Sequence, residues 1–256
     1  MNYRECAKLL LQQDRIMLVT HRDPDGDTSC SAAALCSALR RLGKEAWVFR
    51  NGGYTRTVLP YIEAYIAPED AQPKCFVTVD IAAERMFPAP FEGPVLLNVD
   101  HHASNTHYAP NELVRGEKSS CGEIVLELIK ALCGSVSEEE ATLLYIAVTT
   151  DTGCFQYANT SSSTLAAASE LLRLGARQHE VSVNFFRRVS IARIKLDLPV
   201  PGPPLTMRRK SPPPRQKPPY SDMKPDELFA PRKNELCIFT SGYNDTQSNY
   251  IPFARS

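Results

Sequence analysis

Aspartate and histidine side chains follow four separate apolar runs of this sequence. The runs read RIMLVT, CFVTVD, VLLNVD and LLYIAVTT, and each one ends in, or runs directly into, acidic or histidine residues. A single aspartate after an apolar run is ordinary, because aspartate favours turns and helix caps. Four such segments in one chain are a stronger signal and indicate a shared site. The residues concerned are His21, Asp25, Asp27, Asp80, Asp100, His101, His102 and Asp151.

These residue types together are suited to binding divalent metal ions. Imidazole and carboxylate groups favour an ion such as Mn²⁺ over a metal that prefers thiolates. Carboxylates buried without cations would repel one another, and metal ions would offset that repulsion. The set is larger than one tetrahedral zinc requires and is about sufficient for two ions that share a bridging carboxylate. Two such ions can hold a phosphate between them and activate a water molecule.

The elements that must bring these residues together alternate between strands and helices. We expect strands at 15–20, 45–50, 75–80 and 95–100, because each is a short apolar or β-branched run. Helical spacing predicts helices over 4–12, 29–42, 120–132, 138–150, 161–174 and 178–198. The expected fold class is therefore α/β, a mainly parallel sheet flanked by helices on both faces, with ligands at the carboxyl ends of its strands.

The start of the second predicted helix offers a contact for an anion. Thr28 and Ser29 follow the acidic turn directly, and we expect one of them to cap the helix. Free backbone N–H groups at the same place favour a phosphate oxygen. Capping and phosphate binding are compatible with each other.

Composition excludes several classes of protein. The chain has 256 residues with 29 basic and 29 acidic side chains, so it is not a polycation that binds long nucleic acid through charge alone. It has no apolar run of about 18 residues, so we expect no membrane span. The first residues do not resemble a secretory signal, and the eight cysteines form no C-x-x-C pair. We expect a cytoplasmic protein with free thiols.

The chain changes character near residue 198. Residues 199–256 hold twelve of the twenty prolines and show almost no apolar periodicity. Proline blocks both helix interiors and sheet ladders, so this tail is expected to be mostly irregular. We therefore expect two parts, a globular domain over 1–198 and a proline-rich tail over 199–256.

The segments HRDPDGD, VDIAAER, DHHASNTHY and TTDTGCF resemble, in this order, the four motifs of the DHH phosphoesterase superfamily. The resemblance covers roughly residues 5–195. Together with ASNTHY and SSCGEIVLELIKAL, it is most similar to the nanoRNase and pAp phosphatase branch of that superfamily. Each motif alone is weak, but four in order are specific.

The resemblance implies a role for each candidate residue. His21 and Asp25 would hold one Mn²⁺, whereas Asp27, His101 and Asp151 would hold the second, with Mg²⁺ as an alternative metal. Asp80 would bridge both ions. Asp100 would orient His101, and His102 would contact the scissile phosphate or support the site.

The resemblance also implies the reaction. The expected enzyme is a phosphoric ester hydrolase, of the oligoribonuclease and 3'(2'),5'-bisphosphate nucleotidase type, that uses two metal ions and an activated water on short nucleotide substrates. Alternatives are an inorganic pyrophosphatase or a RecJ-type exonuclease of the same superfamily. A non-catalytic binding protein, whose proline-rich tail docks a partner, is a further alternative. The sequence is also compatible with a homodimer.

The tail departs from the family pattern. Family members carry a second domain, DHHA1, with a Gly-Gly-Gly-His loop over the metal domain, and this sequence has no such loop after Gly175. We expect residues 199–256 to stand in place of that domain, as an aberrant or irregular segment. Substrate positioning would suffer without the loop, so the resemblance predicts impaired activity.

Overall fold

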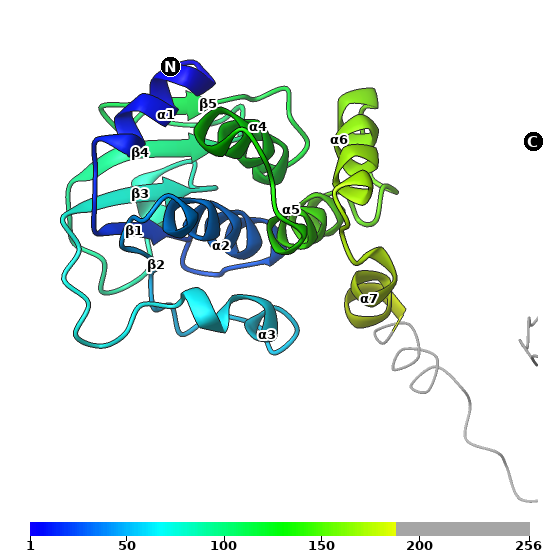
Figure 1. The fold of residues 1–256 in the computed structure, drawn as a ribbon, viewed down its shortest axis with the longest axis horizontal. Helices are drawn as coiled ribbons and strands as arrows, with labels where there is room; N and C mark the ends of the chain where they lie inside the picture. Colours follow the sequence, from blue (N-terminus) through cyan, green and yellow to red (C-terminus); the bar gives the residue numbers. More distant parts are fainter. Residues whose placement is uncertain (188–256) are drawn as a thin grey trace, which may run out of the picture. The chain divides into compact units, whose positions relative to one another are not determined.

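A computed structural model of the chain describes residues 1–187, which form one sheet of five strands with helices packed against it (Figure 1). The strand order is β2-β1-β3-β4-β5, and every neighbouring pair is parallel. The predicted α/β class with a mainly parallel sheet is therefore confirmed. The strands are β1 (Ile16–Val19), β2 (Ala46–Val48), β3 (Cys75–Val79), β4 (Val95–Asp100) and β5 (Glu112–Val114).

The helices agree closely with the predicted ones, apart from several short elements. Segments as short as β5 and α3 carry too few residues for a periodic pattern. The α-helices are α1 (Tyr3–Leu11), α2 (Gly26–Arg41), α3 (Leu59–Ile62), α4 (Cys121–Cys133), α5 (Glu138–Asp151), α6 (Ser162–Arg173) and α7 (Gln178–Val181). The shorter helices are η1 (Glu63–Tyr65), η2 (Glu84–Met86) and the π-helix η3 (Ser182–Arg187).

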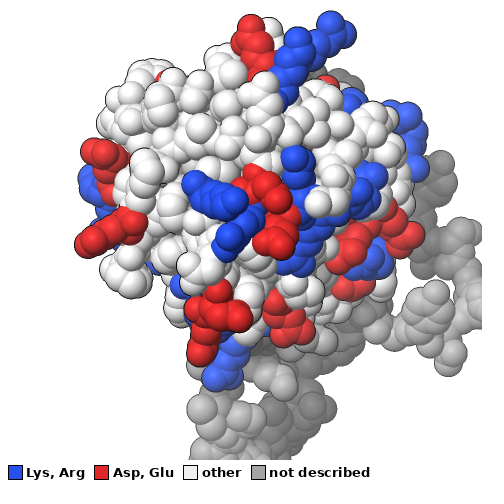
Figure 2. Space-filling model, turned by 60° about the vertical axis from the view of Figure 1, so that its left-hand side comes forward, with Lys and Arg blue, Asp and Glu red and all other residues white. Residues whose placement is uncertain are grey.

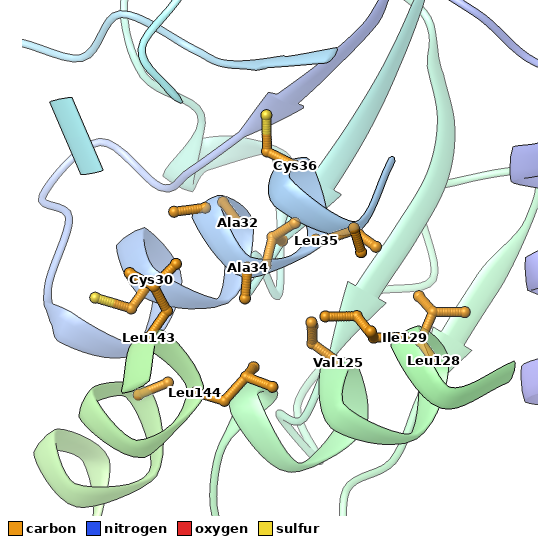
Figure 3. Close-up of a cluster of buried hydrophobic side chains, with 14 of the residues drawn as sticks. Cys30, Ala32, Ala34, Leu35, Cys36, Val125, Leu128, Ile129, Leu143 and Leu144 are labelled. Atoms are coloured by element: carbon orange, nitrogen blue, oxygen red, sulfur yellow. The ribbon is translucent and has the colours of Figure 1, made fainter. Parts of the chain in front are cut away.

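One face of the sheet carries the helical layer. Helices α2 and α4 pack directly on the strands, and α1 and α5 pack on those helices (Figure 1). The layer is filled by small and branched side chains of α2, α4 and α5, among them Ala34, Val125 and Leu144 (Figure 3). Because alanines line much of α2, its neighbours can approach closely and hold its first turn in place.

Irregular segments, and not long helices, cover the opposite face of the sheet. The prediction of helices on both faces is therefore wrong. Met17 and Val19 of β1 point to this side and belong to a second hydrophobic cluster, which contains several aromatic rings. The rings of Phe76 and Phe87 both pack edge-on against Phe91. The connection between β3 and β4 supplies Phe87 and Phe91 and holds only the three-residue helix η2, which is why the expected helix on this face is missing.

Two predicted helix boundaries differ from the structure by more than two residues. Helix α2 begins at Gly26 and not at 29, because Oδ1 of Asp25 caps it by accepting from the amide of Thr28 at 3.1 Å. The expected cap residue Thr28 instead donates its hydroxyl to the carbonyl of Val79 at 2.8 Å. The helix predicted over 178–198 changes at Ser182 to the π-helix η3, and its remainder lies outside the described residues. So does the predicted tail over 199–256.

Candidate metal centre

The parallel strands deliver the predicted residues to one end of the sheet. His21 follows β1, Asp80 follows β3, and Asp100 is the last residue of β4. His101 and His102 follow β4 directly, whereas Asp25 and Asp27 lie at the start of α2 and Asp151 is the last residue of α5. Ligand-capable atoms of His21, Asp25, Asp27, Asp80, His101, His102 and Asp151 fall into three overlapping groups, each with all its atoms within 4.8 Å of one another.

The first group consists of His21, Asp25 and Asp80. Nε2 of His21 lies 3.8 Å from Oδ1 of Asp25 and 3.8 Å from Oδ2 of Asp80. The side chain of His21 is 12% exposed and that of Asp25 is 56% exposed, so this group opens toward solvent on the Asp25 side. A small ligand could reach the group from that side.

The second group consists of Asp27, His101 and Asp151. Nε2 of His101 lies 3.8 Å from Oδ2 of Asp27 and 3.5 Å from Oδ2 of Asp151. It also lies 3.3 Å from Oδ1 of Asp80, so Asp80 faces both groups, with one oxygen toward each histidine. The third group, Asp80 with His101 and His102, overlaps the second.

A backbone carbonyl fixes the orientation of the His101 ring. Its Nδ1 lies 3.2 Å from the carbonyl oxygen of Lys118, which can only accept a hydrogen bond. The proton of the neutral ring is therefore on Nδ1, and Nε2 presents a lone pair to the three carboxylates. This is the tautomer that a metal-binding histidine needs.

Asp27 is held by backbone amides of α4. Its side chain is 1% exposed, and its Oδ2 accepts from the amide of Cys121 at 2.6 Å. Oδ1 accepts from the amide of Gly122 at 2.9 Å and from the hydroxyl of Ser31 at 3.0 Å. The carboxylate is thus fixed at the N-terminus of a helix, and Oδ2 keeps one lone pair for a cation.

Asp80 lies at a strained position and has an unsatisfied oxygen. Its φ angle is 63°, in the left-handed region that aspartate tolerates better than most residues. Its side chain is 4% exposed, and Oδ1 has no hydrogen-bond partner among residues 1–187. An orphaned, buried carboxylate oxygen is costly unless a cation satisfies it.

The structure corrects the role expected for Asp100. We expected this carboxylate to orient His101, but its Oδ1 lies 2.8 Å from Nδ1 of His102, and its Oδ2 accepts from Nδ2 of Asn105. Nδ1 of His101 contacts the carbonyl of Lys118 instead. Asp100 therefore fixes His102, whose side chain is 37% exposed and keeps Nε2 for another partner.

The pKa values reflect an excess of negative charge. Burial first, and the neighbouring Asp80 second, raise the pKa of Asp27 well above its usual range. Burial also raises the pKa of Asp151 to about 6, with help from Asp80 and against the effect of His101. Burial opposes protonation of His101, but the carboxylates around it outweigh burial and raise its pKa to about 10. A divalent cation would offset this charge.

The donor set fits hard or borderline divalent ions. It consists of carboxylate oxygens and imidazole nitrogens, the combination suited to Mn²⁺ and similar ions. The thiol of Cys121, whose backbone amide binds Asp27, donates to the carbonyl of Val99. The free oxygen of Asp80 and the mutual repulsion of the aspartates are both explained if cations occupy the centre.

Other surface features bear on the expected classes. On the face that Figure 2 shows, Lys and Arg side chains lie beside Asp and Glu and form no wide patch of one sign. The described helices include none that is long and apolar enough to cross a bilayer. All seven cysteines within residues 1–187 are free thiols, as expected, and Cys237 lies outside the described part.

Comparison with known proteins identifies one matching family model and several related sequences. A family model described as "DHH family, N-terminal domain" matches residues 15–148. A Thermus thermophilus protein named "Bifunctional oligoribonuclease and PAP phosphatase NrnA" is 37% identical over 171 residues, which are 65% of this chain and 52% of that protein. A "Probable manganese-dependent inorganic pyrophosphatase" of Bacillus velezensis is 26% identical over 68% of this chain and 60% of that protein.

A solved structure shares the fold. The exopolyphosphatase-related protein from Bacteroides fragilis superposes with a TM-score of 0.65 at 22% sequence identity, over 76% of this chain and 63% of that chain. The present chain spans about half the length of its Thermus relative. The family model covers more than half of the sequence, and it covers most of the residues that form the centre described above. This chain belongs to the DHH family.

Proposed function

We propose that this protein is a phosphoesterase that depends on divalent metal ions and acts on short nucleotides. The observation that carries the proposal is the shared position of Asp80 between His21 of one group and His101 of the other. His21 and Asp25 would hold one cation, and Asp27, His101 and Asp151 the second, with Asp80 facing both. Mn²⁺ is the proposed metal, because it suits these donors and a DHH relative is named manganese-dependent. Bound cations of this kind offset phosphate charge and make a water molecule a stronger nucleophile.

The chain's own residues would position the substrate. His102, held through Nδ1 by Asp100, keeps Nε2 free to donate to a phosphate oxygen or to the leaving oxygen. The partly exposed side of the first group, at Asp25, gives the substrate a route to the centre. Asn105 steadies this arrangement, because its side chain binds Asp100 and accepts from the amide of His107 at 2.7 Å.

The proposed reactions are removal of the 3'-phosphate of pAp and shortening of small oligoribonucleotides. Two observations support short nucleotides as the substrates. Relatives named for these activities match the domain that carries the centre. The chain has 29 basic and 29 acidic side chains, and this balance disfavours tight binding of a long polyanion. The relative named for these activities is about twice as long as the region that this chain matches, so the substrate is part of the proposal.

The test measures release of phosphate from pAp and shortening of a trinucleotide by the full chain, with Mn²⁺ and with a chelator. The matched control is Asp80→Asn, which keeps the side-chain shape and removes the charge. We expect metal-dependent turnover that exceeds the turnover of the control, even if the rate is low. Turnover of pyrophosphate alone would assign the runner-up activity. Equal turnover by both chains on every substrate would refute the proposal.

A further inference from the structure

A buried carboxylate lies outside the candidate metal centre. Glu123 occupies the third position of α4, and its side chain is 1% exposed. Its Oε1 accepts from the amide of Ser119 at 3.1 Å and from the hydroxyl of Thr164 at 2.9 Å. Its Oε2 accepts from Nζ of Lys118 at 3.4 Å and from the hydroxyl of Ser163 at 3.3 Å. A buried charge with donors on both oxygens fixes the groups around it.

Two of these donors, Lys118 and Ser119, belong to the segment that leads into α4, and the other two lie in α6. We call residues 118–122 the α4 N-terminal segment. Its carbonyl at Lys118 accepts from Nδ1 of His101, and its amides at Cys121 and Gly122 donate to the carboxylate of Asp27. Two members of the second group are therefore bound to backbone atoms of this segment. A shift of the segment would move both of them.

The third member of the group is bound to the same segment through one asparagine. Nδ2 of Asn159 donates to the carbonyl of Ser119 at 3.3 Å and to the carbonyl of Asp151 at 3.2 Å. The hydroxyl of Ser119 donates in turn to the carbonyl of Asn159. Asp27, His101 and Asp151 thus share one scaffold, which Glu123 holds from behind.

The first group is supported elsewhere. Nδ2 of Asn51 donates to the carbonyl of His21 at 2.8 Å, and the amide of Thr28 donates to Oδ1 of Asp25 at 3.1 Å. These supports come from the loop after β2 and from α2. The two groups therefore differ in what holds them, although they share Asp80.

We propose that Glu123 is a positioning residue for the second group alone. It sets the place of the α4 N-terminal segment, and through that segment the tautomer of His101 and the orientation of Asp27. This inference rests on the proposed metal binding. It predicts that loss of the Glu123 charge weakens one of two cation sites and spares the other.

The test is a Mn²⁺ titration of the metal-free full chain, wild type and Glu123→Gln, followed by electron paramagnetic resonance and calorimetry. The glutamine has one acceptor oxygen, so its amide nitrogen must face either the Ser119 amide or the Lys118 ammonium, both of which only donate. We expect two binding events in both chains, with one weakened roughly 10-fold to 100-fold in the variant, the scale of lost support around a metal ligand.

The matched control is Glu140→Gln. Glu140 is equally buried and has the same third position in α5, where it accepts from Arg41 and from the amide of Ser137. It should lose stability but keep both Mn²⁺ affinities. If Glu123→Gln fails to fold, Thr164→Val removes a single donor, and its smaller effect should still fall on one site.

The outcomes separate the two proposals. A wild-type chain that binds no Mn²⁺ would refute the proposed function and with it this inference. A wild-type chain that binds two ions, with a variant that binds them equally well, would refute the role of Glu123 alone. Equal weakening of both sites in Glu123→Gln would also refute that role, because it would indicate general loss of structure.

Discussion

The amide nitrogen of Gly122 lies 2.9 Å from Oδ1 of Asp27, which joins the first turn of α4 to the first turn of α2. The same glycine lies against α5, where an added Cβ would come within 2.7 Å of the Cβ of Ala147. A residue without a Cβ is therefore required for this close approach of α4 to α5. The backbone of Gly122 therefore takes part both in the packing of α4 on α5 and in the contact that holds Asp27 of α2.

Gly122→Ala should weaken both folding and metal binding. The new methyl group must push α4 away from α5, and overpacking of this kind costs about 1–3 kcal/mol. The displaced amide would no longer hold Asp27, so affinity for Mn²⁺ at one site should fall as well. Urea unfolding of the metal-free chain and a Mn²⁺ titration measure the two effects separately.

A second substitution supplies the control. Ala147→Gly removes the methyl group that the new side chain would meet. The double variant should regain the Mn²⁺ affinity of Ala147→Gly alone, although glycine in a helix costs up to about 1 kcal/mol. If the double variant binds Mn²⁺ as poorly as Gly122→Ala, the close approach of the helices is not what positions Asp27.

Asp100→Asn should lower turnover and leave the number of bound ions unchanged. The carboxylate contacts His102 and Asn105, neither of which belongs to the first or the second group. An uncharged partner would no longer fix the ring of His102, and loss of a charged hydrogen bond costs about 1.5–3 kcal/mol, or roughly tenfold or more in rate. Steady-state kinetics on pAp and a Mn²⁺ titration are the two measurements.

The same variant tests the corrected role of Asp100. Had this residue oriented His101, its replacement would remove a cation as well as activity. Loss of one binding event in Asp100→Asn would therefore favour the original expectation over the contacts described here.

The sequence could predict which residues meet, because parallel strands end at one edge. The apolar runs before His21, Asp80 and Asp100 define β1, β3 and β4, and their carboxyl ends must lie together. The start of α2 could not be predicted, because Asp25 has the residue type of a metal ligand and of a helix cap alike. One side chain serves both purposes.

Backbone partners were beyond prediction from residue types. The Lys118 carbonyl that fixes His101 and the amides that hold Asp27 belong to a segment at least 17 residues away in sequence from either ligand. Any residue provides such groups, so no side-chain pattern marks them. For the same reason the sequence cannot decide whether Asp100 contacts His101 or His102, which are adjacent and of the same residue type.

Asp80→Asn and Asp25→Asn should have different effects on Mn²⁺ binding. Asp80 faces both groups, so its replacement should weaken both binding events. Asp25 belongs to one group, so Asp25→Asn should weaken only one. Asparagine tolerates the left-handed backbone of Asp80 and caps helices about as well as aspartate, so neither chain should unfold.

The comparison uses one titration for both variants, with circular dichroism to verify the fold. Asp151→Asn is a third chain, which should weaken the event that Asp25→Asn spares. If Asp80→Asn weakens a single event, Asp80 does not bridge, and the two groups bind independently.

Stabilisation by Mn²⁺ should grow with pH, because protons compete for the same groups. Burial, together with Asp80 and Asp25, raises the pKa of Asp151 to about 6, although His101 opposes the shift. A carboxyl with a pKa higher in the folded chain contributes stability that is fully present below its unfolded pKa of about 3.9. That contribution is lost as the pH rises through about 6. The metal-free fold therefore becomes less stable over this window, while the ionised carboxylate that a cation needs becomes available.

The measurement is the difference in unfolding temperature with and without Mn²⁺, from about pH 5 to about pH 7.5, a range that spans the raised pKa. We expect a small difference at the lower pH and a gain of several degrees at the higher one. His101, with its pKa near 10, must lose a proton to bind at any pH in this range. Asp151→Asn removes one of the competing protons, so the increase of the Mn²⁺ effect with pH should be shallower than in the wild type. An equal Mn²⁺ effect at both pH values would contradict this prediction, because it would mean that the ion binds without displacing protons from these side chains.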